Sequence, residues 1–363
     1  MPISAVDTIA LAVEHTKQQL FKPFRFGQWV KLAFVGLLAG ELGSSGNFNS
    51  SWRQPGTSGP WHPEISGINL ALVAALVAVV VVAALVIGTI LMYISSVMRF
   101  ILFDSVLARD CRIRAGWERR QGPGWRYFTW KLLYGIATFV GLMVLIGIPA
   151  AFAFASGWFR EPKQHLLPLV LGGVVLFFVV MMFALITGVI FVLTKDFVVP
   201  QMALEEIGVM EGWRRLRPMI QAEKGAYGGY IGMKIVMAIG AGIMVAIATL
   251  ILGFIIAVPT VGLSLIAIIT GKTAGLTWNV YTITLAVVVG SILLAIFLFL
   301  VSLLSVPFIV FFPAYSIYFF AARYPALSAV LYPAASPALN AMPAPPPPPQ
   351  QPPPLPSAPE PIG

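Results

Sequence analysis

The hydrophobic pattern of this chain consists of long apolar stretches rather than short alternating ones. Five stretches are clear and a weaker one precedes them, so that in chain order they cover about 28–46, 68–95, 131–157, 166–194, 229–258 and 281–306. A helix needs about 20 apolar residues to cross a bilayer, and backbone groups in lipid must bond within their own helix. The pattern therefore predicts an all-α polytopic membrane protein, a bundle of about six transmembrane helices.

The predicted helices fall into three pairs whose ends resemble one another. The odd helices begin with lysines at positions 31, 131 and 234, and the even helices end in the runs Phe100–Leu102, Phe197–Val199 and Phe308–Val310. This spacing favours three parallel two-helix repeats. The alternative is that helix ends look alike because lysine and tryptophan prefer membrane interfaces.

Interfacial segments are expected on one side of the bundle. The apolar character of each even helix continues to about residue 107, 204 or 322, and we interpret these extensions as segments in the inner interface, bent at Pro200 and Pro307. Residues 1–27 and 209–220 are amphipathic, and such helices lie flat on anionic lipid or pack against the bundle. The predicted interfacial basic and aromatic residues are Lys31, Lys131, Lys234, Trp117, Trp213, Arg214 and Arg215.

The apolar stripes of the two amphipathic segments can be read from their spacing. They consist of Ile3, Val6, Ile9, Val13 and Leu20 in the first segment and of Val209, Trp213, Leu216 and Ile220 in the second. Apolar residues at three- to four-residue spacing share one helix face, so these stripes are expected to face lipid or the bundle.

The distribution of charge orients the chain. If the N-terminus lies inside the cell, the basic residues on the outer side, of 23 in all, are only Arg53, Arg160, Lys163 and Lys272. Positive residues in short loops favour the cytoplasmic side, so both termini are predicted to be cytoplasmic in a multi-pass cell-membrane protein. The net charge of +9 comes from residues beside the membrane segments, which argues against nucleic acid as a partner. Membrane lipids and other membrane proteins are the expected partners.

Candidate chemistry is sparse, and the protein is expected not to be an enzyme. Cys111 is the single cysteine, and the three histidines are scattered over both predicted sides, so we expect no catalytic residues, no metal site and no cofactor. Gly271-Lys272-Thr273 resembles the end of a phosphate-binding loop, but Ile266 stands where that motif needs a glycine.

Glu41 is the one suspicious ionisable residue. It follows Lys31 by ten positions, a helical rise of about 15 Å, which places it near the middle of a bilayer core about 30 Å thick. Ionisable groups at that depth are usually functional. Two positions are open: an outer rim beside the Gly43–Gly46 loop, or a buried place in the bundle, where Glu41 would have a raised pKa and pair with a polar group of another helix.

The chain divides into three parts by composition. Residues 1–27 form the N-terminal interfacial segment, residues 28–325 the transmembrane domain, and residues 326–363 a proline-rich tail with the run Pro345–Pro349. Such a tail is expected to be disordered or polyproline-II helical, since proline fits neither helix nor sheet.

Two groups of residues carry a family resemblance. Leu20–Phe24 precedes Trp29-Val30-Lys31, and Asp196–Pro200 precedes Gly212-Trp213-Arg214. With these motifs the chain resembles uncharacterised bacterial six-helix membrane proteins, similar to the membrane domain found with some glycerophosphodiester phosphodiesterases. The resemblance implies a membrane-embedded module of the bacterial inner membrane without a defined reaction. It does not carry over diesterase activity, because the inner loops have no room for the catalytic barrel. A non-catalytic protein that organises lipid or partner proteins is the leading hypothesis. The alternative is a transporter or channel subunit for a small or amphiphilic solute.

Overall fold

The computed structural model describes residues 4–41, 70–159, 163–273 and 280–332, and within these ranges every regular element is helical. The all-α prediction is thereby confirmed. In chain order the elements are α1 (Asp7–Phe21), α2 (Phe26–Ala39), α4 (Leu70–Leu107), α5 (Ile113–Ala155), α6 (Leu166–Leu193), the π-helix η1 (Thr194–Val198), α7 (Val199–Glu205), α8 (Val209–Ala222), α9 (Lys224–Thr273), α10 (Val280–Leu304), α11 (Val306–Ala321) and α12 (Pro325–Leu331).

Five stretches of the described chain are long and apolar enough to cross a membrane: Ala74–Leu107, Ile113–Ala155, Leu166–Glu205, Lys224–Gly271 and Tyr281–Ala321. The predicted sixth span, 28–46, is not among them. Its helix, α2, has 14 residues and a length of about 21 Å, which is short of a bilayer core of about 30 Å.

Helix α2 stops early because its end is a Schellman motif. Gly40 has a φ of 79°, and its amide donates to the carbonyl of Leu37, while the Glu41 amide donates to the carbonyl of Gly36. Glycine adopts this left-handed conformation without steric cost and terminates a helix there. The chain consequently turns at Gly40 and directs Glu41 into the protein.

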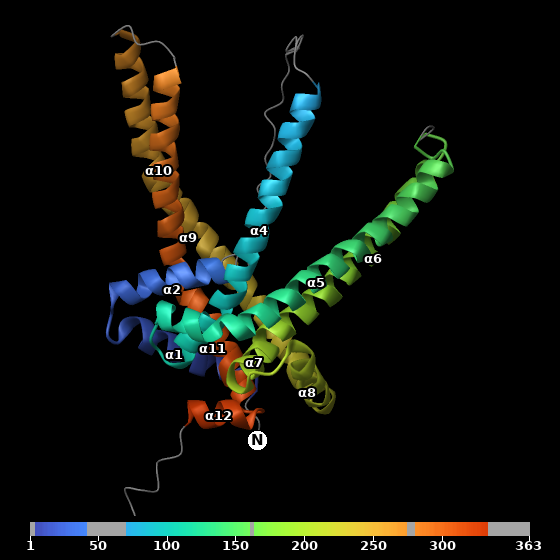
Figure 1. Ribbon diagram of the computed structural model, residues 1–363, viewed down its shortest axis with the longest axis vertical. Helices are drawn as coiled ribbons and strands as arrows, with labels where there is room; N and C mark the ends of the chain where they lie inside the picture. The colour runs from blue at the N-terminus through green and yellow to red at the C-terminus, as the bar shows by residue number, and fades with distance from the viewer. Residues whose placement is uncertain (1–3, 42–69, 160–162, 274–279, 333–363) are drawn as a thin grey trace, which may run out of the picture.

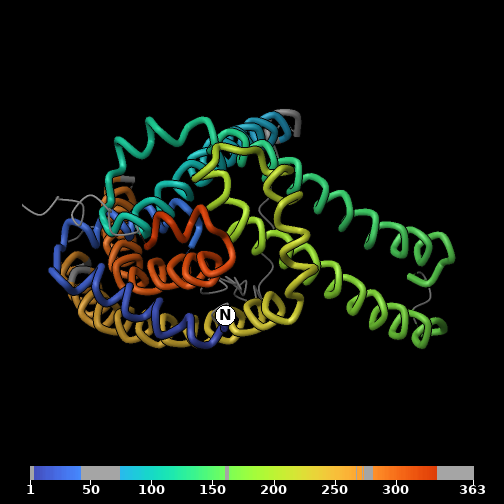
Figure 2. Tube along the Cα trace, turned by 90° about the horizontal axis from the view of Figure 1, so that it is seen from below, coloured from blue at the N-terminus to red at the C-terminus, as the bar shows by residue number. Residues whose placement is uncertain are grey.

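Three arms rise from one compact end of the molecule, which we call the core end (Figure 1). The arms are α4, the α5–α6 hairpin and the α9–α10 hairpin, whereas α2 lies at the bases of α4 and α10. The pairs α2–α4, α5–α6 and α9–α10 are the pairs that the sequence pattern groups together. Seen from below, the α5–α6 hairpin extends far from the other elements (Figure 2). Apolar side chains along the arms are mostly exposed, as expected for surfaces that face lipid.

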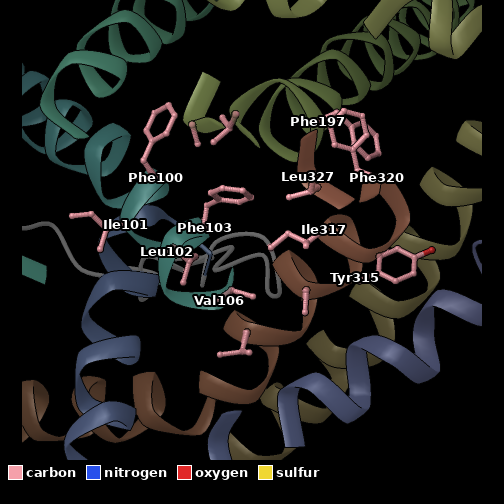
Figure 3. Close-up of a cluster of buried hydrophobic side chains, with 14 of the residues drawn as sticks. Phe100, Ile101, Leu102, Phe103, Val106, Phe197, Tyr315, Ile317, Phe320 and Leu327 are labelled. Atoms are coloured by element: carbon pink, nitrogen blue, oxygen red, sulfur yellow. The ribbon is translucent and has the colours of Figure 1, made fainter. Parts of the chain in front are cut away.

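The core end is built from the three aromatic and β-branched runs. Phe100, Phe197 and Ile309 are all at most 2% exposed and belong to one hydrophobic cluster. Figure 3 shows Phe100 and Phe197 within it. The extensions beyond the arms, namely the end of α4, α7 and α11, are therefore buried inside the core end, and their place in the inner interface stays a prediction. Pro200 and Pro307 occupy first-turn positions of α7 and α11, where proline is tolerated.

Close packing around glycine recurs at all three runs. Ile101 packs against Gly116, Val198 against Gly212 and Ile309 against Gly36. A Cβ atom on Gly212 would lie only 2.6 Å from Cγ1 of Val198, so this contact requires a residue without a side chain. Gly116 and Gly212 thus place the helices α5 and α8 against the ends of α4 and of η1.

The two amphipathic helices behave differently from each other. In α8 the predicted stripe does face the bundle, with Val209 and Leu216 buried. At α1, Val6 and Val13 of the predicted stripe do not face the bundle, since they are 60% and 51% exposed. Helix α1 instead packs its small and polar face, including Ala12, against α11.

The start and end of the described chain, at α1 and α12, both lie at the core end (Figure 1). The predicted tail, 326–363, begins inside helix α12, so its first residues are helical and not disordered. The rest of the tail, 333–363, and the loop around 43–46, within 42–69, lie outside the described residues.

Candidate functional site

Glu41 lies at the centre of a buried group of charges at the base of the arms. Its carboxylate accepts a hydrogen bond from Nζ of Lys195 at 2.7 Å and forms an ion pair with the guanidinium of Arg99. Glu41 is 2% exposed and Arg99 is 7% exposed. The structure therefore places Glu41 inside the bundle and paired with other helices, not at an outer rim.

A second buried ion pair lies beside the first. Nζ of Lys234 on α9 donates to Oδ2 of Asp196, and the hydroxyl of Tyr230 donates to the same oxygen at 3.0 Å. Asp196 is 4% exposed and Lys234 is 8% exposed. We refer to Glu41, Arg99, Lys195, Asp196 and Lys234 as the ionic cluster. It joins α4, η1 and α9 to the chain that follows α2.

The π-helix η1 brings two adjacent residues of opposite charge into this cluster. Lys195 and Asp196 are neighbours in sequence, yet Lys195 reaches Glu41 while Asp196 reaches Lys234. Short π-helical turns inside α-helices often occur at functional sites, because they widen the helix and redirect side chains. Thr194, the first residue of η1, accepts a hydrogen bond from Nε1 of Trp213 at 3.0 Å, which fixes η1 against α8.

Two cavities flank the cations of the cluster. The smaller, of about 20 Å³, lies on the carboxylate side and is lined by Glu41 and Asp196 together with Phe312 and Pro313. This space is enough for about one water molecule, and the polar lining suits one. Two buried ion pairs with room for a hydrogen-bonding water are an arrangement that offsets the desolvation cost of the charges.

The larger cavity, which we call the basic pocket, has a volume of about 350 Å³. Arg99, Lys195 and Lys234 line it as well, and Lys131 on α5 adds a fourth cation. No carboxylate lines this pocket among the described residues. Nζ of Lys131 donates to the hydroxyl of Ser95 at 3.2 Å and forms no ion pair within the described chain. Excess positive charge in a site with low-dielectric walls attracts anions.

The predicted interfacial residues separate into two groups. Lys131 and Lys234 meet at the basic pocket, although they are 103 residues apart in the chain. Lys31 does not join them, since it is exposed and lines a different hollow beside Asp110 and Cys111.

The tryptophan and arginine members of the predicted set lie elsewhere on the core end. Trp117 and Trp213 are half-buried against the hydrophobic cluster. Arg214 and Arg215 are exposed and pair with Glu211 at 2.7 and 3.1 Å. Arg215 also forms an ion pair with Glu205 of α7, and neither arginine contributes to the ionic cluster.

Sequence reasoning missed Arg99, Lys195 and Asp196. A signal for them exists: Arg99 and Asp196 immediately precede the runs that begin at Phe100 and Phe197, so charges of opposite sign occupy matching positions in two of the pairs. Their partners could not be deduced, because Glu41 and Lys195 are separated by 154 residues.

A metal is not suggested by the arrangement of ligands. The described residues contain no group of three or more histidine, cysteine, aspartate or glutamate side chains that could hold one. Both carboxylates of the cluster are instead engaged by cationic side chains.

Comparison with known proteins gives one result for nearly the whole chain. No curated protein and no solved structure matches it. Residues 3–330 match the model of a family of unknown function (DUF7544). This range includes the ionic cluster, the basic pocket and every arm. The chain therefore belongs to this family.

Proposed function

We propose that the protein is a non-catalytic, multi-pass cell-membrane protein that organises anionic lipid at the inner leaflet. The observation that carries the proposal is an exposed turn of alternating aromatic and cationic residues between α1 and α2. We call this turn, residues 21–27, the elbow. Phe21, Phe24 and Phe26 are 53%, 59% and 59% exposed.

Cations lie between these aromatic side chains. Lys22 and Arg25 are exposed. Lys22 stands between a phenylalanine and a proline, and Arg25 stands between two phenylalanines. Trp29 supports the turn from inside, with its ring 5.7 Å from that of Phe21 and its Nε1 donating to the carbonyl of Leu20 at 3.0 Å. Aromatic rings insert at the headgroup level of a bilayer, and each nearby cation adds about 1 kcal/mol of attraction to an anionic leaflet.

The position of the elbow supports the same function. Helix α2 lies at the bases of α4 and α10 (Figure 1), and Phe34 and Leu37 on its outer face are 52% and 43% exposed. A helix in this position, with apolar side chains outward, fits the boundary between headgroups and acyl chains. The exposed Val6 and Val13 of α1 extend that surface.

The orientation in this proposal follows from charge. The core end carries the arginine-rich start of α5 and helix α8, so we place it and both termini on the cytoplasmic side. Other membrane proteins that bind the proline-rich tail are a second class of partner, and nucleic acid is not expected. The resemblance to the membrane domain found with glycerophosphodiester phosphodiesterases, and the bacterial inner membrane as location, stay predictions.

The composition of co-extracted lipid tests the proposal. The protein is excised from its membrane in polymer nanodiscs, and its lipids are compared with those of the bulk membrane. Anionic lipid should be enriched, and the double substitution Lys22→Gln with Arg25→Gln should reduce the enrichment. A matched control neutralises the exposed Arg114 and Arg119 at the start of α5, which should leave the enrichment unchanged. Equal anionic lipid in the nanodiscs and in the bulk membrane would contradict the proposal.

A transporter or channel subunit is the second candidate, and one observation favours it. Charged groups from several helices converge beside a pocket, as they do around the substrate of a transporter. Reconstitution in liposomes separates the two candidates: solute uptake that depends on the protein supports transport, whereas an organiser of lipid gives none.

A further inference from the structure

The basic pocket has the chemistry of an anion site. We propose that it binds the phosphate of an anionic lipid headgroup. This inference rests on the proposed function, and it names the pocket that binds the lipid and the chemical group that is bound. The pocket gathers Arg99, Lys131, Lys195 and Lys234 from four separate elements of the fold.

Charge balance leaves the pocket positive. Among the described residues, two carboxylates pair with these cations, those of Glu41 and Asp196, and both line the smaller cavity and not the basic pocket. Four cations against two carboxylates leave an excess of two positive charges. A phosphate diester supplies one negative charge and a monoester up to two, so a bound headgroup would offset part or all of this excess.

Hydrogen-bond donors are left over on the pocket side. A lysine ammonium has three donors, and Lys195 and Lys234 each give one to a carboxylate. Lys131 gives one to the neutral Ser95 hydroxyl and has no carboxylate partner in the described residues. Charge-assisted hydrogen bonds from such donors to phosphate oxygens are stronger than those between neutral groups.

The shape of the pocket suits a headgroup whose tails extend into lipid. Its volume of about 350 Å³ falls within the usual range of ligand sites, about 300–1,000 Å³. Phe191 and Val192 of α6 form part of its wall, and the exposed apolar surface of the α5–α6 arm begins directly beyond them. A free phosphate ion would fill the polar part of the pocket but would leave this apolar wall without a contact.

Native mass spectrometry of the full chain in detergent tests the site, with short-chain phosphatidic acid, phosphatidylglycerol, phosphatidylcholine and inorganic phosphate as probes. The decisive substitution is Lys131→Gln, because Lys131 takes part in no ion pair of the cluster and its loss leaves both buried pairs intact. Binding of an anionic lipid should weaken about tenfold in Lys131→Gln and recover in Lys131→Arg. Lys31→Gln is the matched control, since Lys31 begins the corresponding helix but lies outside the pocket.

Each outcome decides the question. Tenfold weaker binding of the anionic lipids in Lys131→Gln, with the control unchanged, supports the lipid site. Binding of inorganic phosphate with the same dependence on Lys131, but without lipid binding, overturns the lipid as the source of the phosphate. Unchanged lipid binding in Lys131→Gln overturns the pocket as the site while leaving the proposed function standing. Equal affinity of the native chain for phosphatidylcholine and for the anionic lipids contradicts both.

Discussion

Replacing Glu41 by glutamine should destabilise the protein more than any surface change. The substitution keeps the size of the side chain but removes a carboxylate that is 2% exposed and pairs with Arg99 and Lys195. Both cations would stay buried without their partner. Breaking a buried ion pair in this way costs about 3–5 kcal/mol, mostly because a charge is left uncompensated.

The matched control is an exposed pair at the core end. Arg114 and Glu118 lie 3.7 Å apart with side chains 96% and 70% exposed, so Glu118→Gln should cost no more than about 0.5 kcal/mol. Adding Lys195→Met to Glu41→Gln removes one of the two unpaired cations and should restore part of the lost stability.

The assay is reversible unfolding in mixed micelles with increasing sodium dodecyl sulfate, followed by tryptophan fluorescence. The free energies of unfolding of the native chain, the two single variants at Glu41 and Lys195, and the double variant form a thermodynamic cycle. A loss below about 0.5 kcal/mol for Glu41→Gln, or strict additivity in the cycle, would refute the reasoning, because neither fits a buried and coupled pair.

Three further predictions concern close packing, a helix end and the pKa of a buried histidine. Gly212→Ala should lower the thermal midpoint, since its Cβ would lie 2.6 Å from Cγ1 of Val198, whereas Gly208→Ala has nothing within 4 Å and should not. Gly40→Ala should cost about 1 kcal/mol of unfolding free energy, because φ is 79° there while no atom obstructs the new methyl group. Burial lowers the pKa of His15 below 6.5, with the charge of Arg109 adding to the effect, so the folded state binds fewer protons than the unfolded state. Its contribution to stability is complete above pH 6.5 and is lost as the pH falls toward the lowered pKa, and a pH series of thermal midpoints should show a smaller acid loss in His15→Gln.

The arms could be predicted from the sequence because hydrophobic length is a local property. Each arm needs only its own apolar stretch, so the range 166–194 agrees closely with α6. The range 131–157 agrees with α5 only at its end, because α5 already begins at Ile113. The helix predicted over 28–46 is shorter in the structure because Gly40 ends α2 after 14 residues. The apolar pattern alone does not reveal a glycine in the left-handed conformation that ends a helix.

Helix α1 shows why the buried face could not be predicted. An apolar stripe is expected to turn inward when the surroundings are water, but beside lipid it has no such preference. His15 instead packs inward, with Nε2 hydrogen-bonded to the carbonyl of Val106 at 3.0 Å and Nδ1 facing the Tyr318 hydroxyl at 3.1 Å. These partners come from α4 and α11, far along the chain, and the same holds for the partners of Glu41.

The position of the elbow at the surface of the inner leaflet is tested most directly by spin-label depth. In a Cys111→Ser background, a nitroxide is attached at Phe24→Cys, with Leu85→Cys on the α4 arm and Arg114→Cys as references for lipid and for water. We predict that in liposomes the label at position 24 collides more often with oxygen than with a nickel chelate. Its ratio of the two collision rates should lie between the ratios at positions 85 and 114, as in the headgroup region. A label at position 24 that is as open to nickel as the label at position 114 would contradict it.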